Sequence, residues 1–366
     1  MKIAILTMHS ARNYGAVLQS YALQFVIEKK FNHSPVILNY ISTQRKNSKF
    51  FLKVIDRYKH SRLLSLLFVL ALLPTRIYSQ IVFSRFVKKF LYVDKKKVSD
   101  FKQLSKLEFD ADIFCVGSDQ VWNPHHNDGM DKGFFLAFVP DNKKKISYAS
   151  SVATSELTDV QKNEMKEMLS SFSNISYREY SSEKIFKDIQ LPAEWVLDPT
   201  LLLDKDEWHM MASCGRIPSD YLLLYWFGNV DSIIEKTIAV AKEKNLKIVR
   251  ISTVLRKYPG DEIVEIFPTP QRFIQLFENA GFVITDSFHG TAFSINFNKQ
   301  FYSYPVKRYD DRFYSLFEMF NVYDRDLREE YAKLSKEDIS YSDVNMRLNE
   351  MRNKSDEFLK NALKKE

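Results

Sequence analysis

A histidine follows a short apolar run late in the chain, at a point where a strand gives way to a helix. The run after Gly281 predicts a buried strand, and the residues from Gly290 onward predict the first helical turn. Asp286, Ser287 and His289 fall between the two. In open α/β sheets such turns, at the carboxyl ends of strands, bind ligands, and a helix start directs unpaired N–H groups at them. The imidazole is therefore a candidate for proton chemistry on an anionic substrate.

The structural alternative is that His289 only contacts the backbone of the helix cap. Its combination with Asp286 and Ser287 at one strand end favours the catalytic interpretation. Lys307 and Arg308 follow the next predicted strand, so they can reach the same edge of the sheet.

An arginine also ends an apolar strand, at Arg178. Its guanidinium is always charged and forms a fork that suits a carboxylate or a phosphate. A surface ion pair with the adjacent Glu179 is the alternative.

The first loop of the chain holds Asn13, Tyr14 and Gly15 between a strand and a helix. Glycine allows close backbone approach, and the helix start favours anions. The signal is weak because the loop lacks the glycine-rich dinucleotide fingerprint, and a structural turn is the favoured alternative.

A further loop follows the buried strand 111–116 and contains Ser118, Asp119, Trp122 and Asn123. Serine and aspartate also cap helices, so capping is an equal alternative. The indole favours a loop that faces a sugar or another substrate.

Composition limits the class of protein. The 366 residues are 45% hydrophobic and 27% charged, as in globular proteins, and the net charge of +7 favours anionic partners. No nucleic-acid motif accompanies the scattered positive charge, so we expect no nucleic acid partner. Cys115 and Cys214 cannot form a disulfide framework and show no metal-ligand spacing. With no signal peptide evident at the start, a reducing cytoplasm is the expected location.

Residues 63–73 are almost wholly apolar and lie between Arg62 and Arg76. As a helix this run is about 16 Å long, too short to span a bilayer. A buried helix or an oligomer contact is the favoured interpretation. The alternative is that residues 61–76 form a monotopic helix at a membrane surface, helped by flanking basic residues.

Strand and helix signals alternate twice along the chain, which predicts parallel sheets with right-handed crossovers. The predicted strands are 2–7, 36–40, 111–116, 146–150, 174–177, 221–225, 247–251, the run after Gly281, and 300–304. The predicted helices are 16–30, 157–171, one that begins after Arg178, 231–244, 270–279 and the one that begins near Gly290.

The fold class is therefore α/β, with two Rossmann-like domains facing a cleft. We place the N-terminal domain at residues 1–195, with a basic helical insertion at about 42–106. The C-terminal domain covers 196–334 and carries the histidine turn. The charged tail 335–366 has helical spacing and either packs across the domains or stays mobile.

Five blocks, taken together and in order, resemble the polysaccharide pyruvyl transferase family. The blocks are residues 13–24, 117–123, 175–179, 197–201 and 286–290, and the resemblance extends to about residue 327. It implies a glycosyltransferase-B-like architecture and transfer of pyruvate from phosphoenolpyruvate to sugar hydroxyls of a cell-envelope or exported polysaccharide precursor. The product is a ketal, phosphate is released, and no metal or other cofactor is expected.

The resemblance implies that basic residues bind the donor and that His289 lies in the active site, as acid or as base. The family commonly has a basic residue shortly before this histidine, where this chain has Ser287 and Phe288. The predicted catalytic residues are His289 and Arg178. The predicted donor-binding residues are Arg178, Lys307, Arg308, Ser287, Gly290 and Thr291. The predicted acceptor-binding residues are Asn13, Tyr14, Gly15, Ser118, Asp119, Trp122 and Asn123.

Two alternatives stay open. The same two-domain cleft suits glycosyl transfer from a nucleotide sugar, and the basic insertion suits a non-catalytic, membrane-associated component of saccharide assembly. The acceptor can be lipid-linked or nucleotide-linked, and the sequence does not specify an oligomeric state.

Overall fold

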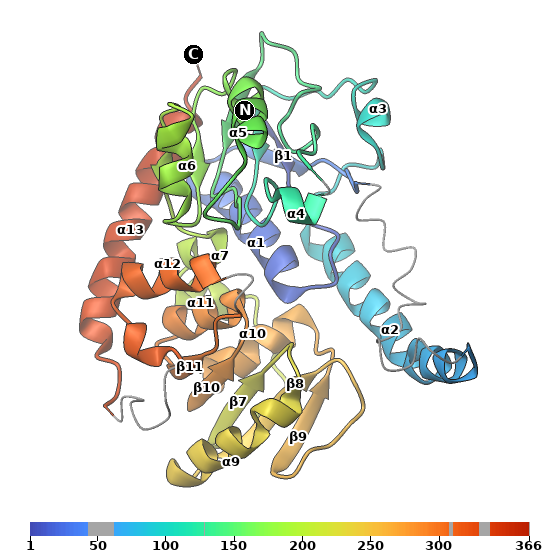
Figure 1. Cartoon of the computed structure of the whole chain (residues 1–366), viewed down its shortest axis with the longest axis vertical. Coiled ribbons are helices and arrows are strands. Elements are labelled where there is room, and N and C mark those ends of the chain that lie inside the picture. Colours follow the sequence, from blue (N-terminus) through green and yellow to red (C-terminus); the bar gives the residue numbers. More distant parts are fainter. Residues whose placement is uncertain (43–61, 128, 307–309, 329–336, 366) are drawn as a thin grey trace.

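Two α/β units, each built on a parallel sheet, make up the chain (Figure 1). The computed structural model describes residues 1–42, 62–127, 129–306, 310–328 and 337–365. The predicted pair of Rossmann-like domains is confirmed.

The N-terminal sheet has the strand order β2-β1-β3-β4, with all pairs parallel. The order reverses between β1 and β3, so the loops after these strands lie at the edge where α/β sheets bind ligands. A two-stranded parallel sheet, β5-β6, continues beside β4 through single bridges. The strands are β1 (Lys2–Leu6), β2 (Ser34–Ile37), β3 (Ile113–Val116), β4 (Lys144–Ser147), β5 (Ser176–Tyr177) and β6 (Glu194–Trp195).

The C-terminal sheet has the order β11-β10-β7-β8-β9, again parallel throughout. The edge strand β9 is absent from the sequence prediction because Asp261–Ile266 mixes acidic and apolar residues, as a half-exposed edge allows. The strands are β7 (Tyr221–Tyr225), β8 (Lys247–Ser252), β9 (Asp261–Ile266), β10 (Phe282–Thr285) and β11 (Gln300–Ser303).

Helices connect the strands and cover the sheets. The first one is shorter than expected, since its last turn widens into the π-helical segment Val26–Lys30. The α-helices are α1 (Tyr14–Phe25), α2 (Arg62–Phe90), α3 (Phe101–Leu104), α4 (Pro124–Asn127), α5 (Asp159–Leu169), α6 (Ser182–Asp188), α7 (Pro199–Leu202), α8 (Lys205–His209), α9 (Ile234–Glu243), α10 (Pro270–Asn279), α11 (Phe288–Asn296), α12 (Asp310–Phe320) and α13 (Tyr341–Ala362).

The two units share one hydrophobic cluster that runs through α1, α7, α10 and α11. Tyr14 of α1 stacks on Phe273 of α10 at 4.3 Å between ring centroids and donates its hydroxyl hydrogen bond to the Pro268 carbonyl. Trp208 packs edge-on against Phe293 of α11. Packed aromatic side chains therefore hold the two units together.

The charged tail forms α13, which packs along both units (Figure 1). Its first residue, Tyr341, donates a hydrogen bond to the Lys299 carbonyl in the C-terminal unit. Near its other end, Phe358 packs on Tyr148, and Ser355 accepts a hydrogen bond from the Leu197 amide. Of the two behaviours expected for the tail, the structure has the packed one.

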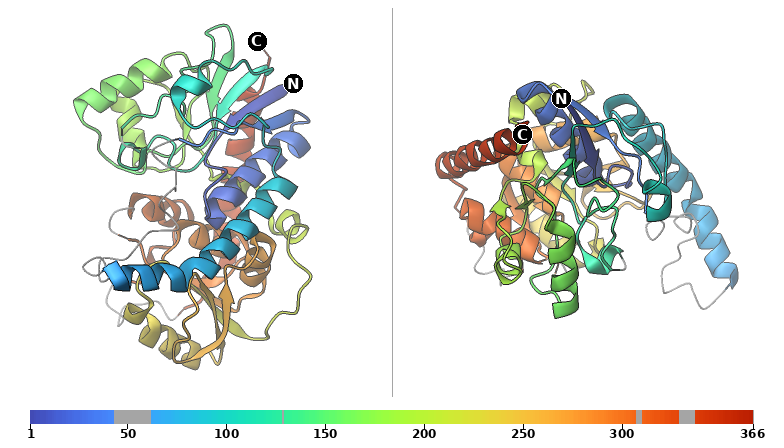
Figure 2. Two further views of the ribbon diagram at one scale, coloured as in Figure 1. Left: turned by 90° about the vertical axis from the view of Figure 1, so that its right-hand side faces the viewer. Right: turned by 90° about the horizontal axis from the view of Figure 1, so that it is seen from above.

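The insertion contains one long helix, α2, which projects from the body (Figure 2). Its 29 residues extend about 43 Å, so the length argument against spanning, made from residues 63–73 alone, is wrong. Among the described residues, the segment Ser65–Phe90 alone is long and apolar enough to cross a membrane, and 29% of its apolar 18-residue window is buried. The insertion is not helical throughout, because Val93 and Val98 bridge to the edge of the N-terminal sheet.

Arg352 of α13 is predicted to stabilise the junction of the two units. Its guanidinium donates to the carbonyls of Leu201 and Leu203 at 2.8 and 3.1 Å and to Asn296 Oδ1 at 2.9 Å. Arg352→Ala should lower the free energy of unfolding by about 2 kcal/mol, because partly buried acceptors lose a charged donor. Urea denaturation measures this loss.

The matched control is Arg347→Ala on the same helix, where the exposed pair with Asp343 predicts a change within about 0.5 kcal/mol. Equal effects of the two substitutions would contradict the assignment.

Candidate active site

The first loop of the chain meets the histidine turn across the boundary between the units. Gly15, at the start of α1, faces the ring of His289, at the start of α11. A Cβ built on Gly15 would lie 2.0 Å from His289 Nδ1, so only glycine fits here. Two loops predicted separately, one for the acceptor and one for proton transfer, are therefore adjacent.

Arg178 lies beside this contact in a buried ionic cluster. Its Nε donates to Glu179 Oε1 at 3.0 Å, and its Nη1 donates to Asp198 Oδ2 at 3.0 Å. The three side chains have at most 1% of their surface exposed, so the surface ion pair considered from the sequence is instead a buried one. Ser151 Oγ donates a further hydrogen bond to Glu179 Oε1. Burial lowers the pKa of the Arg178 guanidinium, but Glu179 and Asp198 outweigh it and raise the pKa overall.

Asp198 is a site residue that sequence reasoning missed. It caps α7 by accepting from the Thr200 amide and hydroxyl, at 2.9 and 2.7 Å, and it accepts from Ser118 Oγ at 3.1 Å. Burial raises the pKa of its carboxyl, but the charge of Arg178 and the hydrogen bonds from Thr200 outweigh that cost and hold the pKa below its ordinary value. The sequence signal that could have identified it is the Asp-Pro pair, which is typical of a helix start.

The surroundings of His289 favour the neutral form of its imidazole. Its Nε2 lies 3.8 Å from Asp198 Oδ2, too far for a hydrogen bond. Burial lowers the pKa of His289 to about 4; the charge of Asp198 opposes this, while Arg178 and Arg312 contribute to the lowering. Burial therefore has the largest effect on the pKa of this imidazole.

Two nitrogens in this cluster have no hydrogen-bond partner among the described residues. These are His289 Nε2 and Arg178 Nη2, and both are buried. Because unsatisfied buried donors cost free energy, such atoms mark a place where a ligand completes the hydrogen bonding.

Phe288 separates two guanidinium groups. Arg178 lies 4.6 Å from the centre of its ring, and Arg312 of α12 lies 5.9 Å from it. Arg312 was not predicted, since it lies well after the histidine block in sequence. It supplies positive charge near the position where Ser287 and Phe288 replace the expected basic residue.

The residues around the histidine turn mainly hold its shape. Ser287 Oγ accepts from the Gly290 amide at 3.2 Å, and Gly290 packs so closely that a Cβ would lie 2.4 Å from Thr285 Oγ1. Thr291, with no exposed surface, donates to the Ser287 carbonyl and bonds Ser303. Thr291 and Gly290 therefore have packing roles in this turn, and donor binding by either residue stays a prediction. A donor contact of Ser287 stays a prediction.

The predicted acceptor residues of the first loop include both buried and exposed side chains. Tyr14 is 5% exposed and its hydroxyl is bonded, so the structure gives it a packing role, and acceptor binding by Tyr14 stays a prediction. Asn13 is exposed and caps α1 by accepting from the Gly15 amide at 2.8 Å. Acceptor binding by Asn13 stays a prediction.

In the second predicted acceptor loop, Trp122 is a core residue. Its indole is fully buried, donates to the Phe134 carbonyl and stacks on Phe135, so the sugar-facing assignment is wrong. Asn123 accepts a hydrogen bond from the His125 amide, as the alternative of a helix-capping role predicted. Ser118, also fully buried, serves Asp198 rather than a sugar.

Asp119 is the partly exposed member of that loop. Its backbone has φ of 72°, in the left-handed region that an aspartate adopts at a cost. Its charge acts on both Arg178 and His289 by raising their pKa values. Lys307 and Arg308, predicted to bind the donor, lie outside the described residues.

A sequence model of the polysaccharide pyruvyl transferase family matches residues 13–308. The chain belongs to this family. It is accordingly a transferase, and its match includes the first loop, the buried ionic cluster and the histidine turn. No curated protein matches the chain significantly in sequence.

Solved structures agree with the fold. A Listeria monocytogenes protein assigned as a UDP-N-acetylglucosamine 2-epimerase aligns at a TM-score of 0.54 with 7% identity, over 98% of this chain and 90% of its own. The Methanocaldococcus jannaschii UDP-GlcNAc 2-epimerase, in complex with UDP-GlcNAc and UDP, aligns at 0.51 with 13% identity over 99% of each chain. These likenesses support the glycosyltransferase-B-like arrangement.

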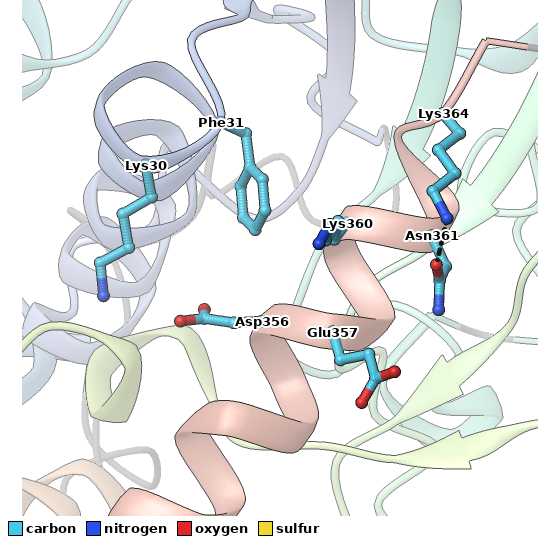
Figure 3. Close-up of a pocket in the computed structure, with 7 residues that line it drawn as sticks. All are labelled: Lys30, Phe31, Asp356, Glu357, Lys360, Asn361 and Lys364. Carbon is cyan, nitrogen blue, oxygen red and sulfur yellow. Dashed lines mark hydrogen bonds between the residues drawn. The ribbon is translucent and has the colours of Figure 1, made fainter.

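A pocket of about 490 Å³ lies elsewhere, between the end of the first helix and α13 (Figure 3). None of the predicted site residues lines it. Its lining residues are Lys30, Phe31, Asp356, Glu357, Lys360, Asn361 and Lys364.

Gly15→Ala should disturb the contact between the units, because its Cβ has no space beside the His289 ring. We expect a loss of about 1–3 kcal/mol in stability, as for other overpacked sites. Gly215→Ala is the control, since its Cβ would find no atom closer than 3.7 Å. Thermal unfolding compares the two variants, and an unchanged midpoint for Gly15→Ala would refute the close contact.

The burial of His289 predicts a pH-dependent stability. Between pH 6.5 and about 4 the unfolded chain binds a proton at this residue that the folded chain does not, so stability falls as the pH falls through this window. His289→Gln should remove about 3 kcal/mol of the change, given 1.36 kcal/mol per pKa unit.

Urea denaturation at a series of pH values provides the measurement. His209→Gln is the control, because that side chain is 71% exposed. If the His289→Gln curve stays parallel to that of the unmodified chain, the imidazole is not buried in its neutral form.

Proposed function

We propose that this transferase moves pyruvate from phosphoenolpyruvate to two sugar hydroxyls of a cell-envelope or exported polysaccharide precursor. The product is a ketal, and phosphate is released. One observation carries the proposal: buried His289 and Arg178 each have a nitrogen without a partner among the described residues, where the strand ends of the two units meet. Membership of the family sets the reaction class.

The donor needs cations for its phosphate and carboxylate. Arg178 offers Nη2, Arg312 adds charge beside Phe288, and the N-terminus of α11 adds its dipole. Lys307 and Arg308 are proposed as further donor cations from their sequence positions. No metal or additional cofactor is part of the proposal.

His289 moves the proton. It is neutral in the free protein, and the negative charges of a bound donor raise its pKa, so we propose that it takes up a proton on donor binding. Transfer of this proton to the methylene carbon makes a cationic carbon that the first hydroxyl attacks, and the neutral imidazole accepts the hydroxyl proton. The carbon–oxygen bond to phosphate then breaks, the second hydroxyl closes the ring, and its proton leaves with phosphate.

Asp198 and Glu179 act as positioning residues. They keep Arg178 charged and aligned despite its burial, and Asp198 places negative charge 3.8 Å from the imidazole. That charge favours the protonated imidazole once the donor has bound.

The acceptor enters from the side of Asn13 and Asp119, the two exposed or partly exposed residues of the predicted acceptor loops. It is a saccharide, lipid-linked or nucleotide-linked, and the expected location is the cytoplasm or its membrane face. Glycosyl transfer from a nucleotide sugar is the second candidate, since an epimerase of similar fold binds UDP-GlcNAc and UDP.

Phosphate release from phosphoenolpyruvate, measured with a panel of lipid-linked and nucleotide-linked saccharides, tests the proposal. His289→Ala should lower turnover by about 10²–10⁴-fold, the range for a lost acid–base group. Arg178→Lys should cause a comparable loss, since lysine keeps the charge but not the fork; Arg178→Ala would leave two buried carboxylates unpaired.

The control is His209→Ala, which removes an exposed imidazole far along the chain. Consumption of a sugar nucleotide without any phosphate release from phosphoenolpyruvate would overturn the proposal in favour of glycosyl transfer. Full turnover in His289→Ala would remove this residue from the mechanism.

A further inference from the structure

The projecting helix α2 exposes an apolar stripe. Its members lie one, three or seven residues apart, with Pro74 of the helix in the longest gap, and these spacings place them on one side of the helix. This pattern is unusual for a monomer, since large exposed apolar patches mark interaction sites. The stripe consists of Leu63 (66% exposed), Leu66 (55%), Leu67 (53%), Leu70 (52%), Ile77 (45%), Tyr78 (47%) and Ile81 (40%).

The opposite face of α2 is fixed to the body of the protein. Phe83 packs on Tyr14 at 5.0 Å between centroids, and Phe86 packs on Tyr21. Both phenylalanines belong to the cluster shared by the two units. A bilayer-spanning arrangement would pull these residues out of the core. Only one side of α2 is therefore available to contact a membrane or another partner.

Positive charge continues the stripe. Arg85, Lys88 and Lys89 are exposed at the end of α2, and the sequence 62–90 contains no acidic residue. The preceding sequence, residues 43–61, holds six lysines and arginines against one aspartate. An apolar face beside basic side chains matches the boundary between acyl chains and anionic headgroups.

We propose that α2 docks this protein on the surface of an anionic phospholipid bilayer, with the stripe in the headgroup boundary. A second copy of the chain fits less well, because α2 has no carboxylate to pair with the basic residues of another α2. The docking surface does not depend on the proposed reaction.

The docking surface adjoins the candidate active site. Arg12 donates to Gln80 of α2 at 2.7 Å, and Tyr14 contacts Phe83. The next residue, Gly15, is the one that faces His289. Docking through α2 therefore brings the first loop of the site to the bilayer, where a lipid-linked acceptor would lie.

Flotation of the full-length protein with vesicles tests the proposal without any substrate. We expect binding to vesicles of phosphatidylcholine with 30% phosphatidylglycerol, on the order of tenfold weaker binding to phosphatidylcholine alone, and weakening by salt. Leu66→Glu/Leu70→Glu should reduce the bound fraction at least tenfold, because carboxylates replace the centre of the stripe.

The matched control is Val160→Glu/Leu255→Glu, which adds the same charges at apolar positions that are 76% and 80% exposed. It should bind as the unmodified chain does, and circular dichroism checks that both variants are folded. Equal binding of the two double variants overturns the proposal. So does a dimer, seen by light scattering, that binds no vesicles and dissociates on Leu66→Glu/Leu70→Glu.

Discussion

The buried arginine between two carboxylates is the constraint on which the site depends. Arg178 pairs with Glu179 and Asp198 where almost no surface is exposed, and none of the three charges would be stable there alone. Asp198 also caps α7 and accepts from Ser118, so one ionic cluster fixes the ends of β3 and β5 relative to α7. His289 completes it from the other unit.

The candidate site therefore lies at a packed boundary between the two units rather than within one of them. Aromatic packing through Tyr14 and Phe273 brings α1 against the C-terminal unit, and Gly15 permits the final approach to His289. The ionic side chains are almost fully buried there, and a low dielectric would strengthen the attraction between these cations and the proposed anionic donor. Tyr14 also contacts Phe83 of α2, so the proposed membrane contact and the candidate site lie on either side of the same segment.

Much of the fold could be predicted from local sequence. The helix 270–279 was predicted with its observed bounds, because Thr269 caps it and Pro270 suits its first turn. Strand β9 was missed because its acidic residues obscure an edge strand. Trp122 was misassigned because an indole after a buried strand suits a core as well as a sugar, and only its surroundings distinguish the two.

The sequence by itself determined which polar residues stand at strand ends, since each end is marked by a local change from apolar to polar residues. His289 and Arg178 were identified in this way. Only the tertiary structure decided which ends meet, that Asp198 and Arg312 join them, and that the imidazole is neutral. The reason is physical: burial and the surrounding charges set a pKa, and both come from segments that are distant in sequence and brought together by packing.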